Sequence, residues 1–128
     1  MSVQSLDHVN IRVKDVEATA AFFTDILGMR RSPERSGWML DAGGHPAIHL
    51  GSADMPYPSD HWRPFEGRED SGAVHHVALS CTGFADVLAR VKANGLRHDI
   101  NEITAASMRQ LFVAEPGGVL LELNFRGE

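Results

Sequence analysis

The sequence feature that most constrains the fold is a strand-like motif that occurs twice. The run Leu6–Val13, L-D-H-V-N-I-R-V, is echoed by the run Val74–Cys81, V-H-H-V-A-L-S-C. Each run has a histidine followed by a valine at its third and fourth positions, which pairs His8 with His76. Because successive side chains of a strand point to opposite faces, each motif predicts one apolar face and one polar face that carries the histidine. Such a polar face is typical of a lined cavity.

A helix is predicted after each copy of the motif. Asp15 is a suitable N-cap for a helix over Val16–Leu27, in which apolar residues recur at helical spacing. Thr82 is the corresponding N-cap candidate for a second helix, which starts near Phe84 and which Gly95 ends. The two halves of the chain therefore begin with the same two elements in the same order.

Short strands follow each helix. We expect them over Met29–Arg35, Trp38–Asp41 and Ala47–Leu50 in the first half, and over Arg97–Glu102, Gln110–Ala114 and Val119–Phe125 in the second. The last two strands of each half are joined by a turn that contains a Gly-Gly pair. Matching the first strands gives a sequence offset of 68 (76 − 8), and matching the last strands gives 73 (122 − 49). An internal duplication accounts for both offsets.

The duplication predicts a single domain over residues 1–128, made of two α+β modules. Module 1 covers about residues 6–50 and module 2 about residues 74–125, with a linker or lid over about 51–73 between them. This segment exceeds the roughly 12–15 residues of a usual unstructured connection. It is rich in proline and aromatic residues, so it is a surface linker, a lid over the cavity, or a crossing to a partner subunit.

Charge and cysteine content narrow the function. The net charge is −5 and lysine and arginine form no cluster, so a nucleic-acid partner is not expected. No apolar run approaches the length of a membrane-spanning helix and the first residues do not resemble a leader, so we expect no membrane partner and a cytoplasmic location. Cys81 is the only cysteine, which excludes an internal disulfide, and on the apolar face of its strand it is expected to be a core thiol.

The duplication singles out four side chains as metal ligands. They are His8 and His49 from the first and last strands of module 1, and His76 and Glu122 from the matching strands of module 2. Glu122 lies in an apolar strand, where a bare carboxylate is costly to bury and a cation is its natural partner. If the modules are related by a pseudo-twofold axis, the four groups converge on one divalent ion, namely Fe, Mn, Ni, Co or Zn. His49 is either a ligand or a substrate contact beside a three-ligand site.

Other residues are predicted to act on a small-molecule substrate near this ion. Asn10 shares a strand face with His8, Trp62 lies in the central segment, and Arg109 either holds an anionic group near the cavity or faces solvent. Glu122 or His49 is the expected catalytic base, if it is displaced from the metal.

These motifs, together with the helix ending in L-G-M and the run F-V-A-E-P-G-G-V-L-L-E-L, resemble the vicinal oxygen chelate superfamily. The resemblance implies paired βαβββ modules that form a cavity-enclosing, barrel-like mixed sheet, with metal ligands at the four positions named above. It also implies a homodimer, in which each site is built by one chain or by two. The chain departs from the bacterial glyoxalase I pattern at His49, where that pattern has a glutamate.

Three functions follow from the resemblance. The first is a metal-dependent lyase or isomerase of glyoxalase type, similar to lactoylglutathione lyase, in which the metal acts as a Lewis acid on a substrate that chelates it through two oxygens. The second is an Fe(II) ring-cleaving dioxygenase, which would consume O₂ with catechols. The third is a metal-free drug-binding protein of the bleomycin-resistance kind, although such relatives generally lack the ligand set that this chain retains.

Overall fold

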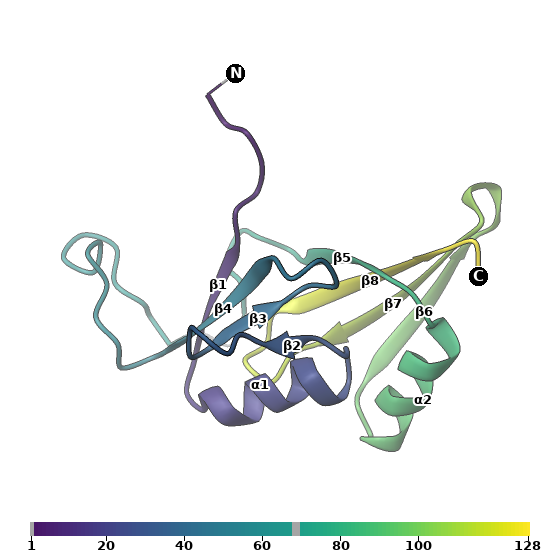
Figure 1. Ribbon diagram of the computed structural model, residues 1–128, viewed down its shortest axis with the longest axis horizontal. Helices are drawn as coiled ribbons and strands as arrows, with labels where there is room; N and C mark the ends of the chain where they lie inside the picture. The colour runs from purple at the N-terminus through teal and green to yellow at the C-terminus, as the bar shows by residue number, and fades with distance from the viewer. Residues whose placement is uncertain (1, 68–69) are drawn as a thin grey trace. The chain divides into compact units, whose positions relative to one another are not determined.

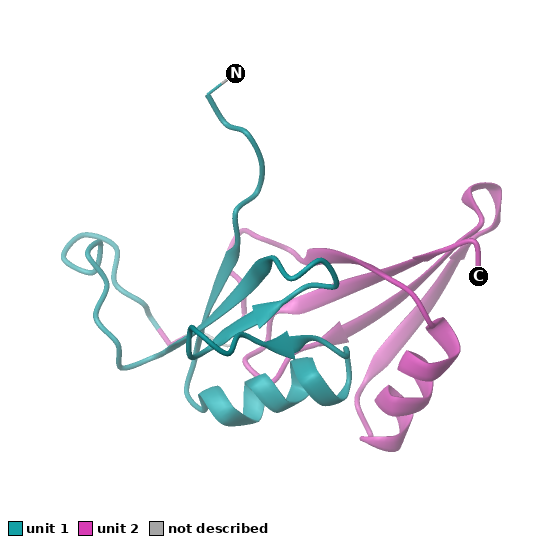
Figure 2. Ribbon diagram, in the orientation of Figure 1, with its two compact units in different colours: residues 1–66 teal, residues 67–128 magenta. Residues whose placement is uncertain are grey.

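The computed structural model describes residues 2–67 and 70–128 and divides the chain into two compact units, Met1–Glu66 and Gly67–Glu128 (Figure 2). Each unit contains a strand, a helix and three further strands in that order (Figure 1). The predicted α+β class and the tandem βαβββ modules are therefore confirmed. No helix among the described residues has the length and apolar character needed to cross a bilayer.

The first unit is a four-stranded sheet with one helix. Its strands lie in the order β1-β4-β3-β2, with β1 parallel to β4 and the other neighbours antiparallel. Helix α1 runs along one face of this sheet (Figure 1), and the carboxylate of Asp15 accepts a hydrogen bond from the backbone N–H of Ala18, which confirms the predicted N-cap. The elements are β1 Val9–Val13, α1 Val16–Asp25, β2 Arg30–Arg31, β3 Trp38–Leu40 and β4 Pro46–Ser52.

The second unit repeats this arrangement. Its strands lie in the order β5-β8-β7-β6, and β5 is parallel to β8 as β1 is to β4. A short 3-10 helix is added between the second and third strands of the unit. The elements are β5 Val77–Cys81, α2 Phe84–Ala93, β6 His98–Ile103, η1 Thr104–Ala106, β7 Met108–Ala114 and β8 Leu120–Arg126.

The register of the two parallel strand pairs agrees with the offsets in the sequence. Asn10 lies opposite His49 in the first unit, and Ala78 lies opposite Glu122 in the second. The sequence numbers of these positions differ by 68 (78 − 10) and by 73 (122 − 49), as the alignment of the motifs requires. The same backbone pairing therefore carries His49 in one unit and Glu122 in the other.

The expected barrel-like sheet needs a correction. Among the described residues, the strands of each unit pair only with one another, so the structure contains two four-stranded sheets and no closed barrel. The alternation of side chains predicted the faces of each strand correctly. Closure depends instead on backbone hydrogen bonds between edge strands, which leave no periodic pattern in the sequence.

The predicted cap of the second helix is also wrong. The N-cap of α2 is Gly83, whose φ of 81° is accessible to glycine at little cost. Glycine has no side chain, so it cannot accept a capping hydrogen bond from the first turn of the helix. The carboxylate of Glu128 takes this role, because it accepts hydrogen bonds from the backbone N–H groups of Gly83 at 3.0 Å and Phe84 at 2.8 Å. A residue so far along the chain from the helix start could not be linked to it by a local motif.

Each helix covers the apolar face of its own sheet, as shown by Phe84 of α2 and Phe125 of β8, whose ring centroids lie 5.3 Å apart. Burial of such aliphatic and aromatic side chains contributes about 1.5–3 kcal/mol each. In the first unit the core contains Ile11, Val13, Ala20, Phe22, Phe23, Met39, Ile48 and Leu50, and in the second it contains Phe84, Val87, Val91, Leu111, Val113, Leu121, Leu123 and Phe125.

Candidate functional site

A cluster of aromatic rings lies on the polar face of the first sheet, around His49 on β4. The indole of Trp38, opposite His49 on β3, stacks on the imidazole with ring centroids 4.3 Å apart and an angle of 6° between the planes. His8, just before β1, places its ring edge-on to Trp38 at 4.6 Å and at 6.3 Å from His49. The first unit therefore brings together the two histidines predicted for it.

Asn10 fixes the orientation of His49. Its amide nitrogen lies 2.9 Å from Nδ1 of His49 and donates a second hydrogen bond to the hydroxyl of Tyr57 at 2.7 Å. Since the amide nitrogen can only donate, Nδ1 of His49 accepts, and the neutral ring carries its proton on Nε2. Gly51 makes room for this arrangement, because a Cβ there would stand 2.7 Å from the Tyr57 hydroxyl.

The charge on His49 is disfavoured by its surroundings. Partial burial lowers the pKa of His49 below its ordinary value, and the nearby charges of His8 and Arg35 lower it further. The Arg35 guanidinium lies 4.0 Å from the centre of the Trp38 ring, so Arg35 is close to the ring cluster around His49. At neutral pH His49 is therefore an uncharged imidazole with Nε2–H as its remaining polar group.

The second unit brings together His76 and Glu122. Nε2 of His76 lies 3.7 Å from Oε1 of Glu122, which is too long for a hydrogen bond, and the two side chains are 35% and 16% exposed. The other carboxylate oxygen, Oε2, accepts a hydrogen bond from the amide of Asn124 at 2.9 Å. One oxygen of Glu122 is thus held by the protein, and the other faces Nε2 of His76.

In both units, the histidine just before the first strand is hydrogen-bonded at Nδ1 by the residue that precedes it in the sequence. Nδ1 of His8 donates to the carboxylate of Asp7 at 2.5 Å, and this hydrogen bond lowers the pKa of Asp7 below its usual range. Nδ1 of His76 shares a hydrogen bond of 2.8 Å with Nδ1 of His75. Because the carboxylate of Asp7 accepts, Nδ1 of His8 is the donor and Nε2 is left for a ligand, as in most metal-binding histidines, whereas the direction of the His75–His76 hydrogen bond depends on the tautomers of the two rings.

The four predicted ligands are divided two and two between the units. Within residues 2–67 and 70–128, no three His, Cys, Asp or Glu side chains gather as a group that could hold a metal ion. The ion site predicted from His8, His49, His76 and Glu122 therefore stays a prediction. The chemistry of the two pairs suits such an ion, because each offers imidazole nitrogen or carboxylate oxygen on a polar sheet face.

Two of the predicted substrate contacts lie apart from these pairs. Arg109 alternates with Gln110 on β7 and turns toward the helix side of the sheet, where its guanidinium lies 4.5 Å from the Phe84 ring and 3.3 Å from Glu102. The contacts of Arg109 are therefore on the side of the sheet opposite Glu122, and its predicted contact with a substrate stays a prediction. Trp62 lies in the loop after β4 with 71% of its surface exposed, and its substrate contact stays a prediction.

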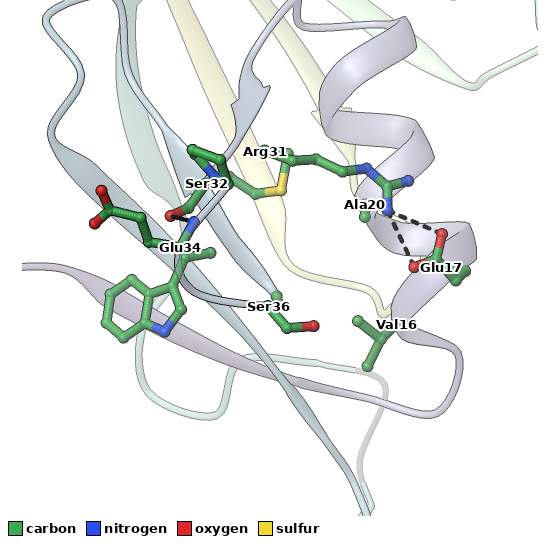
Figure 3. A pocket seen from close by; sticks show the side chains of 11 residues that line it. Val16, Glu17, Ala20, Arg31, Ser32, Glu34 and Ser36 are labelled. Carbon is green, nitrogen blue, oxygen red and sulfur yellow. Dashed lines mark hydrogen bonds and ion pairs between the residues drawn. The ribbon is translucent and has the colours of Figure 1, made fainter.

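A cavity of about 390 Å³ lies in the first unit, between the first turns of α1 and the connection from β2 to β3. Arg31 and Glu17 form one wall through two hydrogen bonds of 2.9 and 3.0 Å (Figure 3). Trp38, whose indole stacks on His49, is also among the residues that line this cavity. None of the predicted ligands or substrate contacts is among the residues that line it.

Several residues that shape the two pairs were not predicted from the sequence. Tyr57 was predicted only as one of the aromatic residues of the central segment. In the structure its hydroxyl accepts a hydrogen bond from Asn10. The guanidinium of Arg12 lies 4.5 Å from its ring and 5.3 Å from the ring of Phe65. Alternation along the last strand predicts that Asn124 shares the face of Glu122, but its hydrogen bond to that carboxylate was not predicted. Trp38 gave no such signal, because its stacking depends on the register between β3 and β4.

Comparison with protein families gives a match over most of the chain. Residues 5–123 match the family described as the Glyoxalase/Bleomycin resistance protein/Dioxygenase superfamily. Two curated relatives, both named lactoylglutathione lyase, come from Salmonella typhimurium and Salmonella typhi. Each is 27% identical over 123 residues, which cover 91% of this chain and 88% of the relative.

Solved structures share the fold at lower identity. An integron cassette protein from the mobile metagenome of V. cholerae is 20% identical, with a TM-score of 0.69 and coverage of 98% of this chain and 97% of the other. A genomically encoded fosfomycin resistance protein from Listeria monocytogenes is also 20% identical, with a TM-score of 0.69 and coverage of 96% and 93%. A glyoxalase/dioxygenase from Nostoc punctiforme is 15% identical, with a TM-score of 0.67 and coverage of 99% and 94%.

Proposed function

Because the chain belongs to the Glyoxalase/Bleomycin resistance protein/Dioxygenase superfamily, we propose that it is a divalent-metal-dependent lyase or isomerase of glyoxalase type. Its substrate is a small molecule that binds the ion through two neighbouring oxygens. The name of the two curated relatives suggests a thiol adduct related to lactoylglutathione as the first compound to test.

The proposed ligands are His8, His76 and Glu122, and the observation that supports them best is the spacing in the second unit. Two ligand atoms on one ion stand roughly 3–3.6 Å apart when each bond is about 2.1 Å long. The separation of 3.7 Å between Nε2 of His76 and Oε1 of Glu122 is close to this range and outside that of a hydrogen bond. His8 offers its Nε2 in the same way, with Nδ1 held by Asp7.

His49 is proposed to contact the substrate beside this three-ligand set. Asn10 holds Nδ1 of His49 and leaves the proton on Nε2, so in this form the ring is a hydrogen-bond donor and offers no lone pair to a metal. A bound ion would supply a Lewis acid for a substrate oxygen. His49 would donate its Nε2–H to that oxygen, with the ring held in place by Asn10.

The test is metal binding followed by an activity screen. We expect elemental analysis of protein purified without added metal, and calorimetric titration with Mn²⁺, Co²⁺, Ni²⁺ and Zn²⁺, to give one ion per chain. Glu122→Gln should weaken binding by at least about tenfold, since it removes a charged ligand. Glu102→Gln is the matched control, because Glu102 is an exposed carboxylate paired with Arg109. A chain that binds none of these ions would overturn the proposal.

A ring-cleaving dioxygenase is the second candidate. If His49 does not bind the metal, the proposed ligands are two histidines and one carboxylate. Non-haem Fe(II) oxygenases use such a set, which leaves coordination positions open. Anaerobic loading with Fe²⁺ followed by O₂ uptake on catechols would favour it, and turnover of 2-oxoaldehyde thiol adducts without O₂ would favour the lyase or isomerase. We also propose a cytoplasmic homodimer, and light scattering from purified protein tests the oligomeric state.

A further inference from the structure

A row of side-chain amides crosses the sheet of the second unit and ends at Glu122. Asn101 on β6 lies opposite Gln110 on β7, which in turn lies opposite Asn124 on β8. Their side chains are joined by hydrogen bonds of 2.7 Å between the first two and 3.0 Å between the second two. Asn124 then donates to Oε2 of Glu122 at 2.9 Å, so the amide row is continuous from the edge strand to the carboxylate.

The carboxylate determines the direction of every hydrogen bond in the amide row. An ionised carboxylate only accepts, so Asn124 must present its nitrogen to Glu122 and its oxygen to Gln110. Gln110 must then donate to Asn124 and accept from Asn101. A flipped amide anywhere in the amide row would place two donors or two acceptors face to face. The orientation of Glu122 is therefore coupled to three residues that lie outside the proposed ligand set.

The amide row belongs to the second unit alone. By the strand register, the residue of the first unit that corresponds to Asn124 is Gly51, since Arg12 pairs with Gly51 as Ser80 pairs with Asn124. The duplication thus preserves the sheet but not the amides. Gln110 and Asn124 are 8% and 9% exposed, and polar groups so deeply buried are costly unless every one is paired. These amides accompany the one carboxylate of the predicted ligand set.

We propose that Asn124 and Gln110 are positioning residues for Glu122. They hold Oε2 and turn the carboxylate so that Oε1 is the single oxygen offered to the ion, next to Nε2 of His76. The inference rests on the proposed function, in which Glu122 is a ligand. Without the amide row, the carboxylate can rotate about its last bond, and the geometry of the ligand set is no longer fixed before the ion arrives.

The test compares Gln110→Met, Asn124→Leu and the amide control Asn94→Ala. Met is close to Gln in shape and removes both hydrogen bonds, whereas Asn94 donates to the carbonyl of Arg90 at the end of α2, away from the amide row. We expect Co²⁺ affinity to fall by about 10–100-fold in Asn124→Leu and about tenfold in Gln110→Met, with no change in Asn94→Ala. The visible absorption bands of bound Co²⁺ should change in the first two, because they report ligand geometry.

A structural role would give a different result. Lowered thermal stability with unchanged Co²⁺ affinity and spectrum in Gln110→Met, while Glu122→Gln loses the ion, would overturn the inference and leave the proposed function standing. Absence of binding in the wild-type chain would overturn both. Where Asn124→Leu does not fold, Gln110→Met alone decides the outcome.

The coupling can also be measured without metal. In ¹⁵N-labelled metal-free protein, Glu122→Gln should shift the side-chain amide resonances of Asn124 and Gln110, because the amide row loses its charged acceptor. Asn94→Ala should leave both resonances in place. If the Gln110 resonance does not respond to Glu122→Gln, the amide row does not transmit orientation, and the inference is wrong.

Discussion

At the scale of single residues, each of the three predicted histidines is hydrogen-bonded by a neighbour at Nδ1, so that Nε2 is available for another partner. Asp7 engages His8, His75 engages His76, and Asn10 engages His49, in each case at Nδ1. The first two partners each immediately precede their histidine in the sequence, so this contact occupies the same position in both modules. The third comes from the neighbouring strand, and it distinguishes His49 from the other two.

Tyr57 provides a test of how the central loop is attached to the first unit. Gly51→Ala would place a methyl group 2.7 Å from the Tyr57 hydroxyl, so we expect the ring to move and its hydrogen bond with Asn10 to break. Tyr57→Phe removes the same hydrogen bond without crowding. Both variants should make the loop more sensitive to limited proteolysis by about the same factor. Equal protection of Gly51→Ala and wild type would contradict the expectation.

Cys81 is predicted to be unreactive in the folded chain. Burial raises the pKa of its thiol to about 11, so at pH 8 the folded protein contains very little thiolate, the reactive form. Iodoacetamide should therefore modify the urea-unfolded chain faster, on the order of tenfold or more. Comparable rates before and after unfolding would contradict this.

The raised pKa of Cys81 also makes the stability of the fold depend on pH. Between the ordinary thiol pKa of 9.0 and the folded value of about 11, the unfolded chain loses the Cys81 proton while the folded chain keeps it. The contribution of this group to the free energy of unfolding therefore falls as pH rises through that window. Cys81→Ala should lack this part of the pH dependence, which denaturant titrations at pH 8 and 10 can measure.

At the scale of elements, the two hairpin turns are built alike around one carboxylate each. Asp41 accepts hydrogen bonds from the backbone N–H groups of Gly43 and His45, and Glu115 accepts from those of Gly117 and Val119. The two turns differ in burial, because Asp41 is exposed whereas Glu115 is 2% exposed. The duplication is therefore visible in the turn chemistry as well as in the strands.

This difference predicts unequal costs of removing the carboxylates. Glu115→Ala leaves the half-buried N–H groups of Gly117 and Val119 without their partner and should lower the free energy of unfolding by about 2–4 kcal/mol. Asp41→Ala exposes its N–H groups to water and should cost about 1 kcal/mol. Urea denaturation of both variants measures the difference. Equal losses would show that burial at Glu115 does not matter.

At the scale of the whole molecule, one ion is proposed to need donors from both units. The variant His8→Ala and the double variant His76→Ala/Glu122→Gln should each lose tight binding, although each leaves the proposed ligands of the other unit untouched. Asp86→Asn/Glu102→Gln is the control, because it removes two exposed carboxylates outside the proposed ligands. Retention of wild-type affinity by either ligand variant, measured by calorimetry, would exclude a shared ion.

Much of the fold was predictable because periodicity and duplication are properties of the chain itself. The alternation around His8 and His76 predicted the two polar faces, and Asp15 predicted the start of α1. The Glu128 cap of α2 was not predictable, because its partners lie far away along the chain. The role of Tyr57 was missed for a similar reason, since it depends on the space that Gly51 leaves.

The sequence by itself determined the family, the two repeated modules and the side chains that share each polar face, because these follow from residue spacing along one chain. Only the tertiary structure decided which nitrogen of His49 is engaged, that Arg109 turns to the helix side, and that an amide row holds Glu122. Strand register and the directions of hydrogen bonds between strands control these features. Both arise from pairing between distant segments, which no local pattern of residues encodes.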